Sequence, residues 1–328
     1  MMESTSLYLS PTIFFPNYQN MLNSFKIYMY TPPNPLSFSS PTESLFFSSL
    51  RTSPFVTQNP EEAHLFFVPF SSNLSTRSIA RFVRDLKLDF PYWNRTLGAD
   101  HFYASCAGLG YESDRSLVEL KKNSVQISCF PAPEGKFVPH KDITLPPLER
   151  VTHASHAPGN RTARYLGFAR YNGVKESNLL NELRNDSDFL IESQPSDGMT
   201  LVGRLGSSGF CLFEYGADIS GIGEALRFGC VPVVITDRPM QDLPLIDVIR
   251  WQKIAVFVGS SGGVKEVKRA LDRTCKDDEC EGLRRLGVAA SQHFVWNEMP
   301  QPYDSFHMLM YQLWLRRHSI RYARREFV

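Results

Sequence analysis

The sequence predicts an α/β protein of two domains, and three observations carry that prediction. The chain has 328 residues, more than a single hydrophobic core usually accommodates. Strand-like and helix-like segments alternate along both halves, as in layered folds built on parallel sheets. Residues 131–163 are rich in proline and glycine, which predicts a linker. We therefore expect an irregular segment at 1–24, α/β domains at 25–150 and 151–300, and a C-terminal helix with a basic tail at 301–328.

In the first half, residues 25–30 alternate between apolar and polar side chains, as a strand does. The continuous apolar run 63–70 predicts a strand buried on both faces, as in a parallel sheet. The other elements expected here are a helix at 40–50, a helix around 79–86 capped by Ser75 or Thr76, and strands at 101–104 and 125–130.

The second half repeats the alternation. Its most apolar strand candidate is 230–235, which follows a short helix at 222–228 that Gly229 would end. The remaining expected elements are strands at 164–168, 189–191 and 209–213, and helices at 178–185, 264–273, 283–295 and 303–317.

Composition narrows the class of protein. Lys and Arg number 35 against 34 Asp and Glu, a net charge of +1, which argues against a nucleic-acid partner. The arginines from Arg316 onward predict a solvated helix face, with a site for an acidic glycan as the alternative. No apolar run is long enough for a transmembrane segment, so we expect none in this chain.

The signals for cellular compartment conflict. The first 20 residues make a poor signal peptide, which predicts a cytosolic protein or one that has lost its targeting segment. Against this, four N-glycosylation sequons suggest a secretory lumen, at Asn73, Asn94, Asn160 and Asn185.

The six cysteines leave the compartment open. Cys275 and Cys280 bracket a short polar stretch that a disulfide could close. Cys211 and Cys230 lie in apolar runs, so we expect them to be buried as small hydrophobic residues. No cysteine and histidine spacing matches a zinc site, and we expect no bound metal.

The segment 210–237 carries the strongest chemical signal. It reads as strand, glycine-rich loop, helix and strand, an order that can expose backbone amides to an anion such as a diphosphate. Glu224, in the first helical turn, could accept hydrogen bonds from ribose hydroxyls. The plain alternative is a tight turn with no ligand. The residues we expect to contact a nucleotide sugar are Ser220, Gly221, Ile222, Gly223, Glu224 and Asp237.

The same segment resembles the signature of the exostosin family, especially its plant branch. The matching stretches are Phe210-Cys211-Leu212, Glu224-Ala225 and the run from Gly229 to Asp237. Further blocks resemble the family in order at 59–70, 91–102, 141–147, 292–297 and 302–307, so that the resemblance spans roughly 25–316.

This resemblance implies a GT-B fold, in which two Rossmann-like domains face each other across a cleft. It implies an inverting glycosyltransferase of the Golgi that needs no cofactor or metal. The C-terminal half would bind a nucleotide sugar, usually UDP-linked, and the N-terminal half a cell-wall polysaccharide or glycoprotein acceptor. A second glycosyltransferase subunit is a candidate partner. Glu224 would take the ribose-binding position, and Asp237 would lie at the carboxyl edge of the sheet.

Inverting transfer needs a general base for the acceptor hydroxyl. Asp100 and His101 are the candidates, because they lie in the most distinctive N-terminal block. The alternative is a structural hydrogen bond between these two residues. His293 and His307 lie on apolar helices and are expected to be structural.

The chain departs from the family pattern at two positions. Gly221 stands where an arginine is expected and Glu214 where a proline is expected. Arg204 or Arg227 are candidate phosphate contacts that could replace the arginine. The departures leave two hypotheses: an active transferase, or a catalytically weakened homologue that binds or scaffolds.

Overall fold

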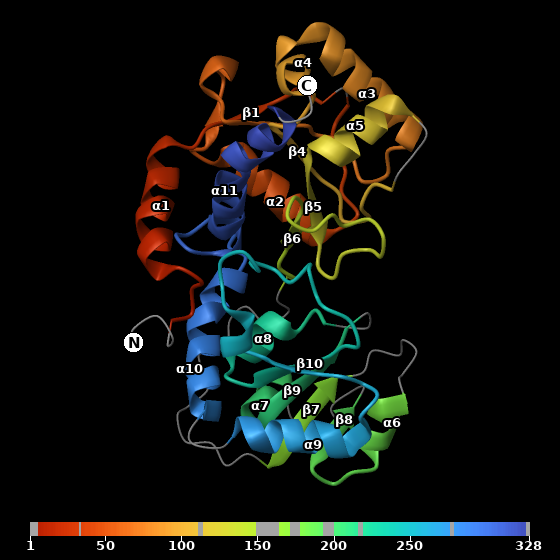
Figure 1. Cartoon of the computed structure of the whole chain (residues 1–328), viewed down its shortest axis with the longest axis vertical. Helices are drawn as coiled ribbons and strands as arrows, with labels where there is room; N and C mark the ends of the chain where they lie inside the picture. Colours follow the sequence, from red (N-terminus) through yellow and green to blue (C-terminus); the bar gives the residue numbers. More distant parts are fainter. Residues whose placement is uncertain are drawn as a thin grey trace. The chain divides into compact units, whose positions relative to one another are not determined.

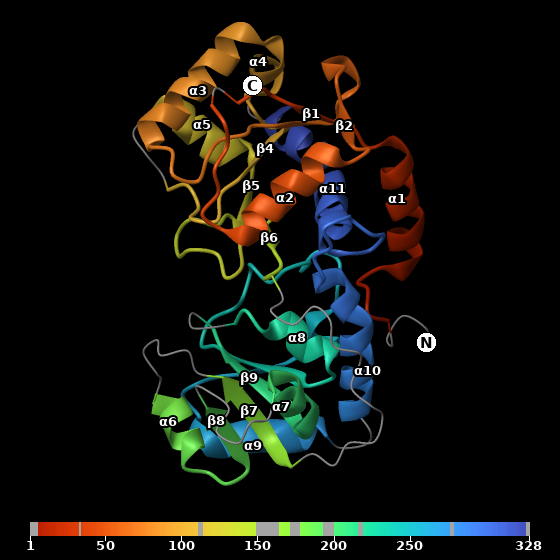
Figure 2. The same cartoon turned by 180° about the vertical axis from the view of Figure 1, so that it is seen from behind.

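The computed structural model describes residues 6–325, except residue 33 and the segments 111–113, 149–163, 171–177, 193–199, 216–218 and 276–278. The chain divides into two compact units, which both views show (Figures 1 and 2). The six-stranded unit comprises Thr12–Pro146, Asp242–Val248 and Trp296–Val328, and the five-stranded unit comprises Met1–Pro11, Pro147–Gln241 and Ile249–Val295. Each unit is a Rossmann-like α/β layer structure, as the sequence predicts.

The five-stranded unit contains a wholly parallel sheet in the order β11-β10-β9-β7-β8. Its strands are β7 (Tyr165–Arg170), β8 (Phe189–Glu192), β9 (Ser208–Glu214), β10 (Val231–Ile235) and β11 (Val256–Val258). Since β8 pairs with one edge of β7 and β9 with the other, the strand order reverses between β7 and β9. Such a reversal opens a crevice at the carboxyl ends of the two strands.

Helices cover both faces of this sheet. One core cluster joins α6 (Asn178–Arg184) and α9 (Gly263–Thr274) to side chains such as Phe189 and Val233. The other joins α7 (Leu201–Ser207) and α8 (Ile222–Arg227) to side chains such as Phe168. The unit also contains α10 (Glu279–Ser291), η3 (Trp251–Lys253) and η4 (Gln292–Phe294).

The six-stranded unit is also built on a parallel sheet, in the order β2-β1-β3-β4-β5-β6. Its strands are β1 (Ile27–Met29), β2 (Val56–Thr57), β3 (Leu65–Phe67), β4 (His101–Ala104), β5 (Val125–Cys129) and β6 (Ile143–Leu145). The strand β6 lies inside the stretch expected to be a linker. Its short apolar run pairs with β5, and Thr144 Oγ1 donates to the Asp242 carbonyl at 2.8 Å. After β6 the chain passes into the five-stranded unit at Pro146 and Pro147, which is one of several crossings between the units.

Helices flank this sheet as well. The cluster on one face includes α3 (Thr76–Asp89), α4 (Pro91–Thr96) and α5 (Arg115–Asn123). On α3, the predicted cap is Ser75, whose hydroxyl accepts from the Ser78 amide at 3.2 Å. Aromatic contacts join α2 (Pro41–Thr52) to β3 and to α11 (Ser305–Arg325), as between Phe46 and Phe306. A short 3-10 helix, η2 (Pro60–Glu62), precedes β3.

The N-terminal segment is not irregular, contrary to the expectation for 1–24. Helix α1 (Pro11–Ser24) buries Phe14, Tyr18 and Met21, and α11 lies beside it (Figure 1). The Tyr18 ring stacks on Tyr303 with centroids 4.3 Å apart, and the Tyr18 hydroxyl accepts from the Tyr303 amide at 2.9 Å. Tyr18 and Tyr303 are 285 residues apart in the chain, so the local sequence does not predict their contact.

The C-terminal helix α11 belongs to the six-stranded unit and is not a separate tail. Its arginine Arg316 is 6% exposed and donates to the carbonyls of Lys141 and Asp142 and to the Asp247 carboxylate. The first arginine of the expected solvated face is therefore buried. Among the described residues, no helix combines the length and the apolar character needed to cross a bilayer.

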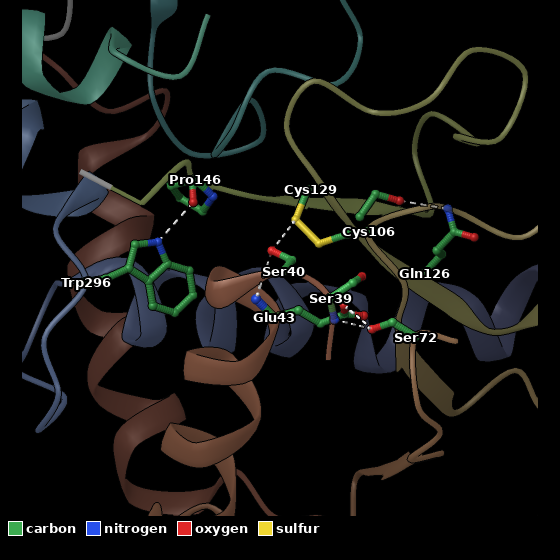
Figure 3. Close-up of a disulfide and its surroundings, with 10 residues drawn as sticks. Ser39, Ser40, Glu43, Ser72, Cys106, Gln126, Cys129, Pro146 and Trp296 are labelled. Atoms are coloured by element: carbon green, nitrogen blue, oxygen red, sulfur yellow. Dashed lines mark hydrogen bonds between the residues drawn. A yellow bond between two sulfur atoms is a disulfide. The ribbon is translucent and has the colours of Figure 1, made fainter. Parts of the chain in front are cut away.

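A buried carboxyl group lies at the start of α2. Glu43 is fully buried, and its Oε2 accepts from the Ser72 hydroxyl at 2.6 Å (Figure 3). The Ser40 hydroxyl caps the helix by accepting from the Glu43 amide. Beside it, the disulfide Cys106–Cys129 joins the chain after β4 to the end of β5. Burial raises the pKa of Glu43, against the lowering effect of Ser72 and of the Cys106 amide.

We expect Glu43→Gln to raise the melting temperature at pH 7. Because the folded-state pKa is raised, the carboxyl group contributes stability that is complete below its unfolded pKa and is lost as the pH rises through the folded pKa. A neutral amide escapes that loss. The variant and the wild type should therefore melt together below about pH 4 and separate as the pH rises.

Glu119→Gln is the matched control of opposite sign. Burial works to raise the pKa of Glu119, but the hydrogen bond and charge of Lys87 lower it overall. Its carboxylate therefore stabilises the fold above its unfolded pKa, and the variant should melt below the wild type at pH 7. Equal melting temperatures of Glu43→Gln and the wild type at pH 7 would contradict the prediction for Glu43.

Candidate functional site

The glycine-rich segment of the five-stranded unit folds as strand, loop, helix and strand. Gly229 adopts φ 66 after α8, and its amide donates to the Leu226 carbonyl at 3.0 Å. This left-handed residue ends the helix, as its sequence position predicts. The Cys230 amide then donates to Ala225, and β10 begins one residue later.

A pocket opens at the carboxyl ends of β7 and β9, where the strand order reverses. The empty space is about 450 Å³ when the open mouth is counted, and the space that a water-sized molecule can occupy inside it is about 40 Å³. The lining combines apolar side chains with a few polar and charged ones. It consists of Phe168, Arg170, Leu201, Leu205, Cys211, Leu212, Phe213, Ser220, Gly221 and Glu224.

Glu224 lines this pocket from the first turn of α8 and is 3% exposed. A Cβ atom at Gly221 would lie 3.6 Å from Glu224 Oε2, so the carboxylate folds back over the turn. Ser220 and Gly221 line the pocket, whereas Ile222 and Gly223 are buried and do not. The structure thus brings three of the six expected contact residues together at one opening.

The amides of the turn are a weaker anion site than the sequence suggests. The Ile222 amide already donates to the Ile219 carbonyl at 3.3 Å. Helix α8 has six residues, so it aligns few peptide dipoles. Positive charge for an anionic ligand has to come from side chains.

Arg204 does not supply that charge, contrary to expectation. It is 2% exposed, and its guanidinium donates to both carboxylate oxygens of Glu192 at 2.7 and 3.1 Å. This bidentate pair fixes α7 to the end of β8. Arg227 lies in the last turn of α8, away from the turn that carries Gly221, and is not among the residues that line the pocket.

The lining includes a cation that the sequence analysis missed. Arg170 is the last residue of β7, exposed at the carboxyl edge of the sheet. The strand expected from sequence ends at residue 168, two residues before the end of β7. Because side chains two residues apart on a strand share a face, a strand extended to residue 170 has Arg170 on the same face as Phe168, and both line the pocket.

Asp237 lies at the carboxyl edge after β10, as expected, but its carboxylate serves a neighbouring loop. It accepts from the amide of Ser260 at 2.7 Å and from the Ser260 hydroxyl. The hydroxyl bond is the main cause of a lowered pKa for Asp237. Asp237 is not among the pocket-lining residues, and its hydrogen bonds to Ser260 stabilise the turn before α9.

Cys211 and Cys230 are buried, as expected, and they are also bonded to each other, a pairing that the sequence analysis does not predict. Apolar surroundings suit a buried disulfide as well as a buried thiol, and sequence alone does not separate the two. The bond links β9 to the residue before β10, 19 positions apart, and closes the segment that carries Glu224. A disulfide also joins Cys275 to Cys280.

A family model described as the Exostosin GT47 domain matches residues 21–273, well over half of the chain. The chain belongs to the exostosin GT47 family of glycosyltransferases. A probable glycosyltransferase of Arabidopsis thaliana is 29% identical over 351 aligned residues, covering 96% of this chain and 73% of the relative. A probable beta-1,4-xylosyltransferase of the same plant is 26% identical, covering 80% of this chain and 70% of the relative.

Among solved structures, the kitacinnamycin glycotransferase resembles the chain with a TM-score of 0.36 and 13% identity, covering 89% of this chain and 99% of that one. In the described part of the chain, no cluster of three or more His, Cys, Asp or Glu side chains is placed to hold a metal ion.

The second expected site of this GT47 chain, the pair Asp100 and His101, lies in the core of the six-stranded unit. Both side chains are fully buried. The His101 ring bonds through Nδ1 to Asp100 at 2.8 Å and through Nε2 to the Tyr30 hydroxyl at 2.9 Å. It also stacks on Phe66 with centroids 5.0 Å apart.

These contacts leave the pair no access to an acceptor. Burial lowers the pKa of His101, against the hydrogen bond and charge of Asp100. Burial works to raise the pKa of Asp100, but His101 and Thr96 lower it overall. A general base has to reach the hydroxyl that it deprotonates. The geometry favours the structural hydrogen bond, and we assign the pair no catalytic role.

His293 and His307 also have structural partners, in the Tyr8 hydroxyl and the Asp304 carboxylate respectively. Three of the four sequon asparagines are exposed, namely Asn73, Asn94 and Asn185. The fourth, Asn160, lies outside the described residues. Their glycosylation stays a prediction.

Proposed function

We propose that this exostosin-family chain is an inverting glycosyltransferase that moves a sugar from a UDP-sugar to a hydroxyl group of a cell-wall polysaccharide or glycoprotein in the Golgi lumen. One observation carries the proposal: Glu224 lines an open pocket at the strand reversal of the five-stranded unit. Open α/β sheets bind nucleotides at such reversals. A carboxylate there can accept hydrogen bonds from both ribose hydroxyls.

The reaction exchanges one bond at the anomeric carbon. The acceptor oxygen forms a bond to that carbon from the face opposite the leaving group, while the bond to the diphosphate oxygen breaks. The electron pair and negative charge pass to UDP, and the acceptor proton passes to a base. Because charge grows on the diphosphate as the bond breaks, a cation at the pocket would lower the barrier.

The cysteines support the lumenal part of the proposal. All six are in disulfides: Cys106–Cys129, Cys211–Cys230 and Cys275–Cys280. Disulfides persist in oxidising compartments and are rare in the cytosol. The Golgi lumen therefore suits this chain better than the cytosolic alternative considered from the N-terminal sequence.

The test is UDP release with a panel of donors and glycan acceptors. UDP-xylose and UDP-glucuronic acid come first, because curated relatives are named as probable xylosyl- and glucuronosyltransferases. We expect one donor to give acceptor-dependent UDP release, with an inverted linkage in the product. Binding of UDP without turnover across the panel would instead support the catalytically silent homologue. The open pocket, with both a carboxylate and a cation, favours the active form.

A further inference from the structure

The charges of the pocket are few and are set by the fold. Of the ten residues that line it, two carry charge, Arg170 and Glu224. A nucleoside diphosphate brings further negative charge to a pocket that already holds a carboxylate. Its binding there requires a compensating cation, because unpaired charge in a partly apolar pocket is costly.

Strand alternation aims Arg170 at the pocket. Residues two apart on a strand share a face, and Phe168 and Arg170 both line the opening, whereas Ala169 packs into the core on the opposite face. Since Arg170 ends β7, its side chain starts from the carboxyl edge of the sheet, beside the point where the strand order reverses.

The acid opposite Arg170 on β8 is already paired. In the parallel β7–β8 ladder, Arg170 lies opposite Glu192. Arg204 holds Glu192 through two hydrogen bonds at 2.7 and 3.1 Å. The charge of Glu192 is thus neutralised from α7, and Arg170 is left to meet a ligand.

We propose that Arg170 is the residue that binds the diphosphate of the donor, with Arg204 keeping it available by pairing with Glu192. This inference rests on the proposed function, in which Glu224 holds the ribose. In this assignment Glu224 binds the nucleoside of the donor and Arg170 binds its phosphates. Gly221, which has no side chain, contributes no charge to this site.

The test compares uridine, UMP and UDP binding by titration calorimetry to the full chain and to Arg170→Gln. We expect the variant to lose about 10- to 100-fold in UDP affinity, the effect of removing charge-assisted hydrogen bonds, and to keep its uridine affinity. Added salt should weaken UDP binding to the wild type more steeply than to the variant.

Arg164→Gln is the matched control. Arg164 is exposed at the opposite end of the same strand, just before Tyr165, and the change removes the same charge. It should bind UDP as the wild type does. The proposal is overturned if Arg170→Gln keeps full UDP affinity, or if it loses uridine and UDP equally. A wild-type protein that binds neither ligand would overturn the proposed function as well, so the two failures are distinguishable.

Discussion

Replacing Glu224 by glutamine should lower the catalytic efficiency for the donor by about 100-fold or more, with the fold retained. Glutamine keeps the shape of the side chain but has one acceptor oxygen and no charge. A hydrogen bond to a charged group contributes about 1.5–3 kcal/mol, so losing one and weakening a second accounts for that factor. The measurements are kcat/KM in a UDP-release assay and the affinity for uridine, which should fall together.

Glu266→Gln provides the control for this change. Glu266 also lies in the first turn of a helix of the five-stranded unit, but its carboxylate pairs with Arg269 at 3.2 Å and does not line the pocket. Activity of this variant should match the wild type. If Glu224→Gln keeps its donor KM and its uridine affinity, the ribose-binding assignment is wrong.

Removing the disulfide Cys211–Cys230 by a double substitution to alanine should strongly destabilise the fold. The bond closes a stretch of 19 residues, for which the loop-entropy relation gives about 3 kcal/mol of lost unfolding free energy. Both cysteines are buried, so the missing sulfur atoms add to that loss. Denaturant unfolding of the five-stranded unit measures it.

The pair Cys275 and Cys280 serves as an internal comparison. Its disulfide spans five positions, so the same relation gives a loss about 1 kcal/mol smaller than for the longer loop. The two double variants should also differ in function, because only the Cys211–Cys230 loop carries Glu224. A smaller loss for Cys211–Cys230 than for Cys275–Cys280 would refute the prediction.

The central strands of both sheets could be predicted from sequence, and the clearest of them are continuous apolar runs. The run ending at Ile235 is apolar at every position of β10, and all five of its residues are buried. Only a strand covered on both faces tolerates that pattern. The neighbouring strand β9 and the intervening helix α8 are also predicted from sequence, and with them the place of Glu224, whereas the short neighbouring strand β11 is not.

Long-range partners explain most of what the sequence could not show. Helix α1 contains Pro16 and lacks a strong apolar stripe, yet its aromatic side chains pack on Tyr311 of α11 and on Tyr303, just before that helix. Likewise, the sequence does not show that Arg204 pairs with Glu192, because Glu192 lies 12 residues earlier, on a different element.

Burial explains the misassigned base. The sequence does not show whether a polar pair at the start of a strand faces a ligand or the core. Only the tertiary structure shows that Tyr30 and Phe66 enclose His101. The distinctive block around Asp100 therefore reflects a structural network that joins α4 to β4.

The packing of α1 against α11 bears on how the protein is made. Phe14 and Tyr18 are synthesised well before Tyr303 and Tyr311, because these partners are separated by more than 280 positions. The six-stranded unit therefore cannot be completed until the chain has been synthesised past these two tyrosines. Until then, the aromatic side of α1 lacks its cover and is exposed apolar surface of the kind that promotes aggregation.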